Sequence, residues 1–304
     1  MQPISNRIPF KIRHAYSLVF LLLGILVGPS SLADEKDVVF SNGLLFKIEK
    51  PQHPVSYVLG TIHSGDPRVL SLSEQIRSAI SDSDRYIMEV VLDGATVFSS
   101  LGNLWLLDGQ KLQQVIGDEL YTEVVKAGKQ TGVPEATFTY MKPWVVMVMF
   151  SLPPGNYDNI LDIYLMKMAL KQNMEIFGLE TAAEQFDVFD AMSSEDQKKL
   201  LQSTLKNFPE LTKQYEKLLK AYLEKNLRKM LELGEQQMAA SEKALVGRLM
   251  KRLVDDRNRR MVERLLPKLS DVSNFVAVGA LHLPGKEGIL NLLQKQGFIV
   301  TRVE

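Results

Sequence analysis

The sequence contains no cysteine and few histidines. Its 304 residues include four histidines, two tryptophans and no cysteine. The absence of cysteine excludes disulfides, thiolate catalysis and cysteine-ligated zinc sites. A chain of this length can bury a sufficient apolar core without covalent cross-links, so the absence does not indicate a cellular compartment.

The sequence also lacks a net charge of one sign. It holds 36 lysines and arginines against 36 aspartates and glutamates, which gives a formal net charge of +0. Such a balance leaves no basic surface of the kind that binds nucleic acid, and we expect no nucleic-acid partner. The basic run KRLVDDRNRR carries its own aspartates and is typical of one face of a helix.

Three common catalytic motifs are missing. HExxH is absent, which excludes a zinc peptidase site built on a single helix. GxSxG is absent, which excludes the usual serine hydrolase turn. The segment PGKEG is no phosphate-binding loop, because it lacks the required glycine spacing and the hydroxyl residue after lysine.

The N-terminal segment has the pattern of a secretory signal peptide. Basic residues precede the apolar run 18–27, and small residues follow it up to Ala33. That run is much shorter than the roughly 20 residues that span a bilayer, so we expect no membrane span in the mature form. The pattern predicts a signal peptide over 1–33 with cleavage after Ala33, and a periplasmic or secreted mature chain, 34–304, that forms a single domain.

Strand patterns lie mainly toward the two ends of the chain, and helical patterns fill the middle. Short apolar or alternating runs predict strands at 44–50, 56–63, 85–91, 174–180, 274–282 and 298–304. Apolar residues at helical spacing predict long helices over 209–237 and 245–269. This order predicts an α+β or α/β fold. Its central mixed sheet is built from N- and C-terminal strands, and a large helical lobe spans about 95–270.

Two segments from opposite ends of the chain are near copies of each other. YVLGTIHSGDPRVL contains His63, VAVGALHLPGKEGIL contains His282, and each runs from an apolar strand into GxxH. Ligand sites gather at the carboxyl ends of strands, and imidazole serves there as a metal ligand or general base. A glycine before each histidine permits a sharp turn or a close approach. The pair therefore predicts one composite site, although a histidine that merely caps a sheet is the alternative for each motif.

Two acids and one arginine are further candidates. Glu89 and Glu180 each end an apolar run and can act as oxygen ligands or as a base. For Glu89 the alternatives are a buried arginine partner or a solvent-facing position. For Glu180 the alternative is a helix N-terminal acid. Arg257 can direct its guanidinium at a carboxylate or an oxyanion, and its alternative is a solvated charge run.

Taken together, the motifs resemble the TraB/GumN family, which is related to the Tiki metalloproteases. The resemblance rests on GTIH, YIMEV, GLET followed by Gln185, DDRN and above all VGALHLPG, and it extends over most of the mature chain. It implies a metal site formed by His63, Glu89 and His282, with Arg257 and Asn258 in support. Manganese or cobalt is the metal that the resemblance favours, and zinc is the alternative.

The sequence thus leads to two hypotheses of different classes. The first is an exported, metal-dependent hydrolase of a peptidase-like or esterase-like kind, in which a bound metal lowers the pKa of water for attack on a carbonyl. Its partner would be a peptide or a small-molecule substrate. A metal-free variant of it uses a histidine or Glu89 as general base. The second is a non-catalytic periplasmic protein that binds a ligand, a peptide or haem. The methionine-rich segment 144–150 could form one wall of its pocket, and ordinary core is the favoured alternative for that segment.

Overall fold

The computed structural model describes residues 38–91, 102–107, 109–153, 157, 159–236 and 243–304. The predicted signal peptide, 1–33, lies outside the described residues. Within these residues, no helix combines the length and the apolar character needed to cross a membrane.

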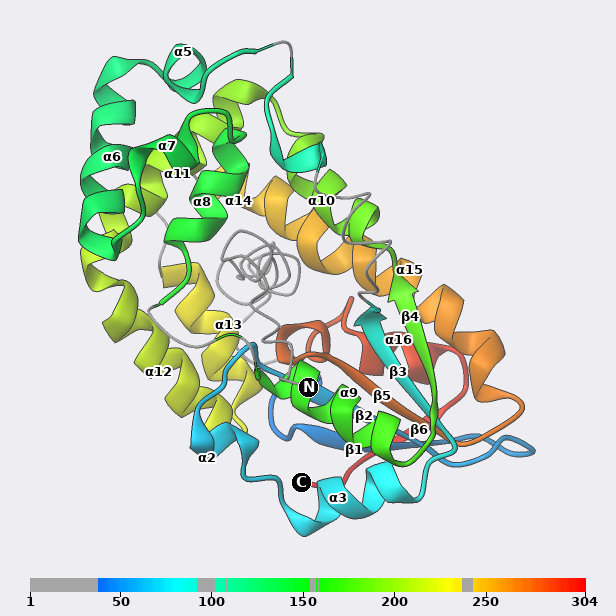
Figure 1. Ribbon diagram of the computed structural model, residues 1–304. Helices are drawn as coiled ribbons and strands as arrows, with labels where there is room; N and C mark the ends of the chain where they lie inside the picture. The colour runs from blue at the N-terminus through cyan, green and yellow to red at the C-terminus, as the bar shows by residue number, and fades with distance from the viewer. Residues whose placement is uncertain (1–37, 92–101, 108, 154–156, 158, 237–242) are drawn as a thin grey trace, which may run out of the picture.

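A six-stranded mixed sheet forms one side of the molecule (Figure 1). Its spatial order is β4-β3-β5-β2-β1-β6. The strands are β1 (Leu45–Glu49), β2 (Ser56–Thr61), β3 (Arg85–Val90), β4 (Glu175–Glu180), β5 (Asn274–Gly279) and β6 (Ile299–Arg302). The predicted strands are therefore all present, and the α+β architecture is confirmed, with β4 contributed by the middle of the chain.

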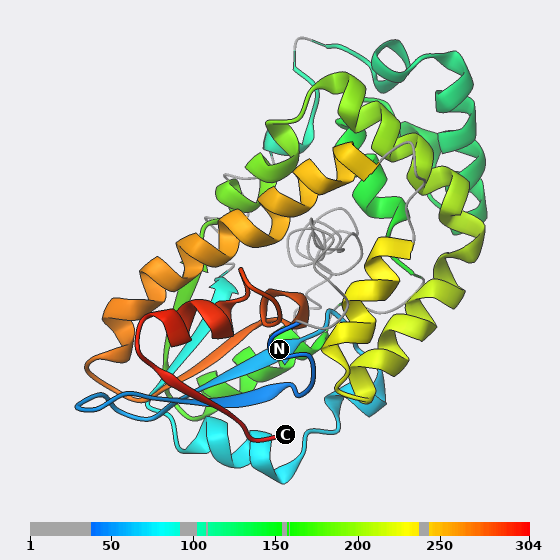
Figure 2. The same cartoon turned by 180° about the vertical axis from the view of Figure 1, so that it is seen from behind.

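The central strands are parallel and covered by helices on both faces, which explains why they are so apolar. β4, β3, β5 and β2 run parallel, whereas β1 pairs antiparallel with both β2 and β6. Helices α3 (Glu74–Ser81) and α9 (Leu161–Lys171) lie on one face of the sheet (Figure 1). The opposite face is covered by α15 (Asp256–Leu265) and α16 (Ile289–Lys295) (Figure 2). A strand covered on both faces must be apolar nearly throughout, which is why RYIMEV and NFVAVG show no alternation.

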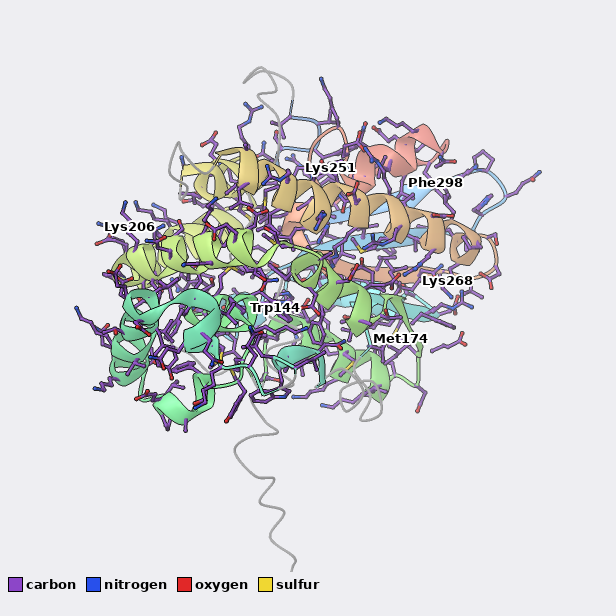
Figure 3. All side chains as sticks on the ribbon, turned by 90° about the horizontal axis from the view of Figure 1, so that it is seen from above. Trp144, Met174, Lys206, Lys251, Lys268 and Phe298 are labelled. Carbon is purple, nitrogen blue, oxygen red and sulfur yellow. The ribbon has the colours of Figure 1, made fainter. Side chains whose placement is uncertain are left out.

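Apart from the short α2 (Pro67–Leu70), which contacts α9, the remaining α-helices build a lobe. Its members are α5 (Leu112–Ile116), α6 (Asp118–Thr131), α7 (Glu135–Phe138), α8 (Pro143–Phe150), α10 (Ala182–Asp190), α11 (Ser194–Asn207), α12 (Leu211–Leu223), α13 (Leu227–Gln236) and α14 (Lys243–Met250). Figure 3 shows Trp144 and Lys206 of this lobe on one side, and Met174, Lys268 and Phe298, each close before a strand, on the other. The lobe therefore stands over the carboxyl ends of the parallel strands.

One predicted helix is divided. The pattern over 209–237 predicted a continuous helix, but α12 ends at Leu223 and α13 begins at Leu227. Between them Lys225 adopts a φ of 55°, and its carbonyl accepts a 2.8 Å hydrogen bond from the Gly43 N–H. The break turns the chain so that α12 and α13 can both reach the end of β2.

Candidate functional site

The first GxxH motif places His63 just beyond the end of β2. Its imidazole Nδ1 lies 2.7 Å from Oδ2 of Asp162, the second residue of α9. The other carboxylate oxygen of Asp162 accepts a 2.7 Å hydrogen bond from the Thr61 hydroxyl. The ring atom Nε2 of His63 is buried and has no hydrogen-bond partner.

The second motif places His282 in a short 3₁₀ turn (Ala280–His282) after β5. Asn258 donates through Nδ2 to the Glu287 carbonyl at 2.8 Å, which turns its Oδ1 toward the imidazole. That oxygen can only accept, so Nδ1 of His282 carries the proton of their 2.6 Å hydrogen bond. The Nε2 lone pair of a neutral His282 therefore faces the site.

The two motifs meet because β2 and β5 are parallel neighbours, with Gly60 opposite Val278 and Thr61 opposite Gly279. A Cβ atom on Gly60 would lie 2.7 Å from the Leu283 side chain and 3.0 Å from the Ala280 backbone. Neither motif glycine has a positive φ. Of the two predicted reasons for glycine, close approach is therefore the one that applies at Gly60.

Glu89 lies in β3, beside β5, and both of its carboxylate oxygens are bound. Oε1 accepts a 2.6 Å hydrogen bond from the Gly279 N–H and lies 3.8 Å from His282 Nε2. Oε2 accepts a 2.7 Å hydrogen bond from Nη2 of Arg257. The predicted alternative of a buried arginine partner is thus present, in the same place as the predicted site.

Arg257 forms the centre of this cluster and is fully buried. Its Nε and Nη2 donate to the Glu180 carboxylate, at distances between 2.5 and 3.1 Å. Its Nη1 donates to the Leu253 carbonyl at 3.0 Å and lies 3.2 Å from Nε2 of His282. With the bond to Glu89 these contacts engage all five guanidinium N–H groups.

Arg257 owes its position to an irregular turn. A π-helical turn over Lys251–Asp255 precedes α15, and its Leu253 carbonyl is the one that Arg257 binds. Such turns recur at functional sites because they rotate one side chain out of the regular helical register. Within α15, Arg257 and Asn258 lie on the buried face with Met261, which explains why Arg257 is the one fully enclosed basic residue in the run 251–260.

Glu180 ends β4 and completes the group. Besides Arg257 it accepts hydrogen bonds of 3.3 Å each from Arg260 and from Gln185. Gln185 also reaches Glu89 Oε2 at 3.5 Å. The structure therefore brings all six predicted site residues into one buried region, namely His63, Glu89, Glu180, Arg257, Asn258 and His282.

The buried charges shift one another's pKa values. Burial alone would raise the pKa of Glu89, but Arg257 and the two histidines, with the Gly279 N–H, lower it to about 2. Burial is also the main cause that lowers the pKa of His282 to about 3, so this imidazole is neutral at physiological pH. Burial would lower the pKa of His63 too, yet the Asp162 carboxylate outweighs it and the pKa is raised. The two histidines thus have different electrostatic environments.

A cavity separates the sheet from the lobe at this point, and both histidines line it. Thr61 and Gly279 contribute from the strand ends. The other walls are apolar and come from the loops after β2 and β5, from α12, from α13 and from the π turn: Ile62, Leu218, Met230, Leu253, Val254, Ala280 and Leu281. A group bound beside the histidines would therefore meet apolar surface on the lobe side.

The site has residue types that ligate divalent metals, two histidines and a glutamate, but only His63 has a coordinating atom without a partner. Nδ1 of each histidine is held by a side-chain oxygen, which leaves Nε2 directed inward, as is usual for metal-ligating histidines. Nε2 of His63 has no hydrogen-bond partner, so its lone pair is free to coordinate a metal. Glu89 and Nε2 of His282 are instead engaged by Arg257. In the part of the chain that the structure describes, no three histidine, aspartate or glutamate side chains converge as a ligand group.

Sequence reasoning missed Asp162, which binds His63, and Thr61, which binds Asp162. The signal at Asp162 was a single acid near the start of the apolar run ILDIYL, a pattern equally typical of any helix N-terminus. It also missed Tyr215 of α12, whose hydroxyl donates to Ser64 Oγ at 2.7 Å and ties the lobe to the first motif.

Fold and site together define a class of protein: an α+β domain in which two GxxH strand ends from opposite parts of the chain meet above a buried Glu–Arg–Glu cluster. The model of the TraB/PrgY/gumN family matches residues 44–302, and the chain belongs to that family. This confirms the resemblance that the motifs carried.

A curated relative gives a more distant comparison. The Metalloprotease TIKI2 of Xenopus tropicalis is 24% identical over 314 aligned residues, which cover 85% of this chain and 59% of that protein. The chain thus spans about three fifths of the length of that relative. No solved structure matched the chain.

Proposed function

We propose that the protein is a hydrolase that cleaves a peptide or ester bond at the cavity between His63 and His282. The observation that supports this most strongly is the pairing of two buried imidazoles from opposite ends of the chain, each with Nδ1 bound by an oxygen acceptor. A histidine that merely caps a sheet needs no such second partner. Here both rings turn Nε2 toward the site, where that of His63 has no partner and that of His282 lies 3.2 Å from Arg257 Nη1.

We propose further that the enzyme is metal-dependent. His63, His282 and Glu89 would hold a divalent cation, with manganese or cobalt favoured and zinc as the alternative. Such an ion acts as a Lewis acid and lowers the pKa of a bound water. Asp162 and Asn258 would fix the orientation of the two ligand rings.

Arg257 has a distinct part in this proposal. Because all five of its N–H groups already have acceptors, it holds Glu89 and the metal-free form of His282 in place, and a metal bound at His282 Nε2 would have to displace Arg257 Nη1 from that atom. Contact with an oxyanion, the role that its sequence context predicted, would require Arg257 to give up one of these partners. Glu180 balances the guanidinium from the opposite side and keeps it out of the cavity.

The cavity indicates the kind of group that lies beside the reacting bond. Its lobe-side wall is formed by Leu218, Met230, Leu253 and Val254, with no charged side chain among the lining residues apart from the histidines. A charged substituent would lose its hydration there without gaining a partner. We therefore propose that an uncharged, apolar substituent is accepted next to the scissile carbonyl.

Export completes the proposal, and it rests on the sequence alone. The signal-peptide pattern over 1–33 supports a periplasmic or secreted mature protein. N-terminal sequencing of the protein from the periplasmic fraction would give a start at Asp34. A full-length protein recovered from the cytosol would contradict export without affecting the proposed chemistry.

Hydrolysis of a mixed fluorogenic peptide and ester panel tests the proposed activity. The purified protein is dialysed against chelator and assayed before and after addition of Mn²⁺, Co²⁺ or Zn²⁺. We expect loss of hydrolysis on chelation, recovery with at least one metal, and loss in both His63→Ala and His282→Ala. His53→Ala is the matched control, because His53 lies in the turn that precedes β2, at the opposite end of that strand from His63, with its Nδ1 3.1 Å from the Pro51 carbonyl.

Each other outcome has a definite meaning. Hydrolysis that survives complete metal removal, yet is lost in both histidine variants, would contradict the metal and retain the metal-free mechanism. Absence of hydrolysis in the wild type with every metal, together with saturable ligand binding, would favour the binding protein over the enzyme. Equal activity of wild type, His63→Ala and His282→Ala would contradict the site itself.

A further inference from the structure

Asp162 is a buried carboxylate that neither the sequence motifs nor the family resemblance singled out. It lies in the first turn of α9, about one hundred residues along the chain from His63, and is 6% exposed. An acid in the first turn of a helix commonly stabilises the positive end of the helix dipole. The question is whether Asp162 has a role beyond that.

The contacts of Asp162 point away from its own helix. Oδ2 lies 2.7 Å from Nδ1 of His63, and Oδ1 accepts the Thr61 hydroxyl at 2.7 Å. An acid that served only the helix end would accept hydrogen bonds from backbone N–H groups of the first turn. Both oxygens of Asp162 instead bind side chains at the end of β2.

The backbone reinforces this contact. The N–H of Leu161, directly before Asp162, donates to the Ser64 carbonyl at 3.0 Å. Ser64 follows His63 in the chain, and its Oγ in turn accepts the Tyr215 hydroxyl from α12. The segment Thr61–Ser64 is thus fixed to α9 by one backbone bond and two side-chain bonds.

The hydrogen bonds of Asp162 determine which ring nitrogen of His63 carries the proton. The Thr61 hydroxyl donates to Asp162, and an ionised carboxylate can only accept, so Nδ1 of His63 must be the donor of their bond. The proton of a neutral His63 therefore lies on Nδ1. Nε2, buried and unpartnered, then carries the lone pair on the side of the cavity.

We propose that Asp162 is a positioning residue that fixes His63 in the Nδ1–H tautomer with Nε2 facing the cavity, and that Thr61 orients Asp162 for this task. The inference deepens the proposed function, on which its relevance to catalysis rests. It gives the two histidines parallel supports, a carboxylate for His63 and the Asn258 amide for His282. Only the support of His63 carries a charge.

Nitrogen NMR of the full chain labelled with ¹⁵N-histidine tests the inference without relying on activity. Spectra are recorded metal-free, at a pH above the titration of His63, with its signals assigned by their loss in His63→Gln. We expect the Nδ1–H tautomer in the wild type. In Asp162→Ala we expect conversion to the Nε2–H form or a mixture, because the acceptor of the Nδ1 proton is gone.

Two further variants separate positioning from folding. Asp162→Asn keeps an oxygen acceptor of the same size, so the wild-type tautomer should return. Thr61→Val removes only the hydroxyl and should give a partial shift toward Nε2–H. Asp190→Ala is the matched control, because Asp190 likewise accepts a ring N–H, from Trp144 at 2.8 Å, but lies in the lobe. It should leave His63 unchanged.

Metal affinity supplies a second measurement. Titration with Co²⁺ should show binding about 10–100-fold weaker in Asp162→Ala than in the wild type, with most of the loss restored in Asp162→Asn. An unchanged His63 tautomer in both Asp162→Ala and Thr61→Val would overturn the inference. A tautomer that depends on Asp162 in a wild type that binds no metal and hydrolyses nothing would support the positioning role while the proposed function fails.

Discussion

The guanidinium of Arg257 donates a 2.7 Å hydrogen bond to the carboxylate of Glu89, and neither side chain has more than 8% of its surface exposed. The same guanidinium binds Glu180, so one buried cation serves two buried anions. Removing the cation would leave Glu89 without its guanidinium partner, and Glu180 with Arg260 alone, in a low-dielectric interior. This relationship gives the first prediction.

Arg257→Ala should lower the free energy of unfolding by about 3–5 kcal/mol, the usual loss when one partner of a buried ion pair is deleted. The free energy of unfolding of Arg257→Lys should lie between those of Arg257→Ala and the wild type. An ammonium keeps the charge but cannot replace all five N–H donors of the guanidinium. Arg252→Ala, an exposed arginine of the preceding turn, should change stability by less than about 0.5 kcal/mol. Urea unfolding of the three variants checks the prediction, and equal stability of Arg257→Ala and the wild type would refute it.

Gly60 should tolerate no side chain. The Cβ of Gly60→Ala would meet the Ala280 backbone at 3.0 Å and the Leu283 side chain at 2.7 Å, so the two GxxH motifs would have to move apart. We expect a loss of about 1–3 kcal/mol in stability, as for other overpacked sites. Gly102→Ala is the control, since no atom lies within 4 Å of the added carbon. Thermal unfolding of both variants measures the difference, and similar midpoints would contradict the close approach.

Acid should destabilise the metal-free protein through His282. Its pKa is lowered from 6.5 to about 3, so below pH 6.5 the unfolded chain binds a proton that the folded chain does not, and stability falls with pH. Glu89 adds a second loss between about pH 4.5 and 2, because its pKa is lowered to about 2. The raised pKa of His63 acts in the opposite direction, stabilising at low pH.

The contribution of His282 can be isolated by subtraction. Between about pH 6.5 and 5 the free energy of unfolding of the wild type should fall more steeply than that of His282→Gln, by up to about 1.4 kcal/mol per pH unit. Chelator in the buffer keeps metal from altering the comparison. Identical pH slopes for the two proteins would mean that His282 titrates normally in the folded state.

The apolar cavity should set substrate preference. Met230 lines the cavity from α13, and Met230→Trp should narrow the cavity. Hydrolysis of peptides with a large apolar residue beside the scissile bond should then fall at least about 10-fold relative to peptides with alanine at that position. The change should appear in KM more than in kcat. Leu170→Trp is the control, because Leu170 is 56% exposed on α9. A uniform change for all peptides would place the cavity outside the binding region.

Much of this arrangement was predictable from sequence. The strands could be predicted because buried parallel strands require continuous apolar runs, and RYIMEV and NFVAVG meet that requirement. The two histidines could be paired because each ends such a strand within the same short motif. Glu89 could be singled out because an unpaired acid inside an apolar strand is costly, so that a partner had to exist.

The remaining features depend on contacts that no local pattern carries. The break at Lys225 interrupts a segment of good helix formers, and it is stabilised by a bond from the distant Gly43. Asp162 and His63 are likewise brought together only by the packing of α9 against the sheet. For Arg257, composition indicated a solvated run, and the π turn before α15 directs that one side chain inward.

The most direct test of the composite site is the metal content of purified wild type, His63→Ala, His282→Ala and His53→Ala after equilibration with Mn²⁺ or Co²⁺ and removal of free ions. If the two GxxH motifs form one metal site, the wild type and His53→Ala should hold one ion per chain, and both His63→Ala and His282→Ala should lose it. Equal metal content in all four proteins, or none in the wild type with any of the ions, would contradict the account.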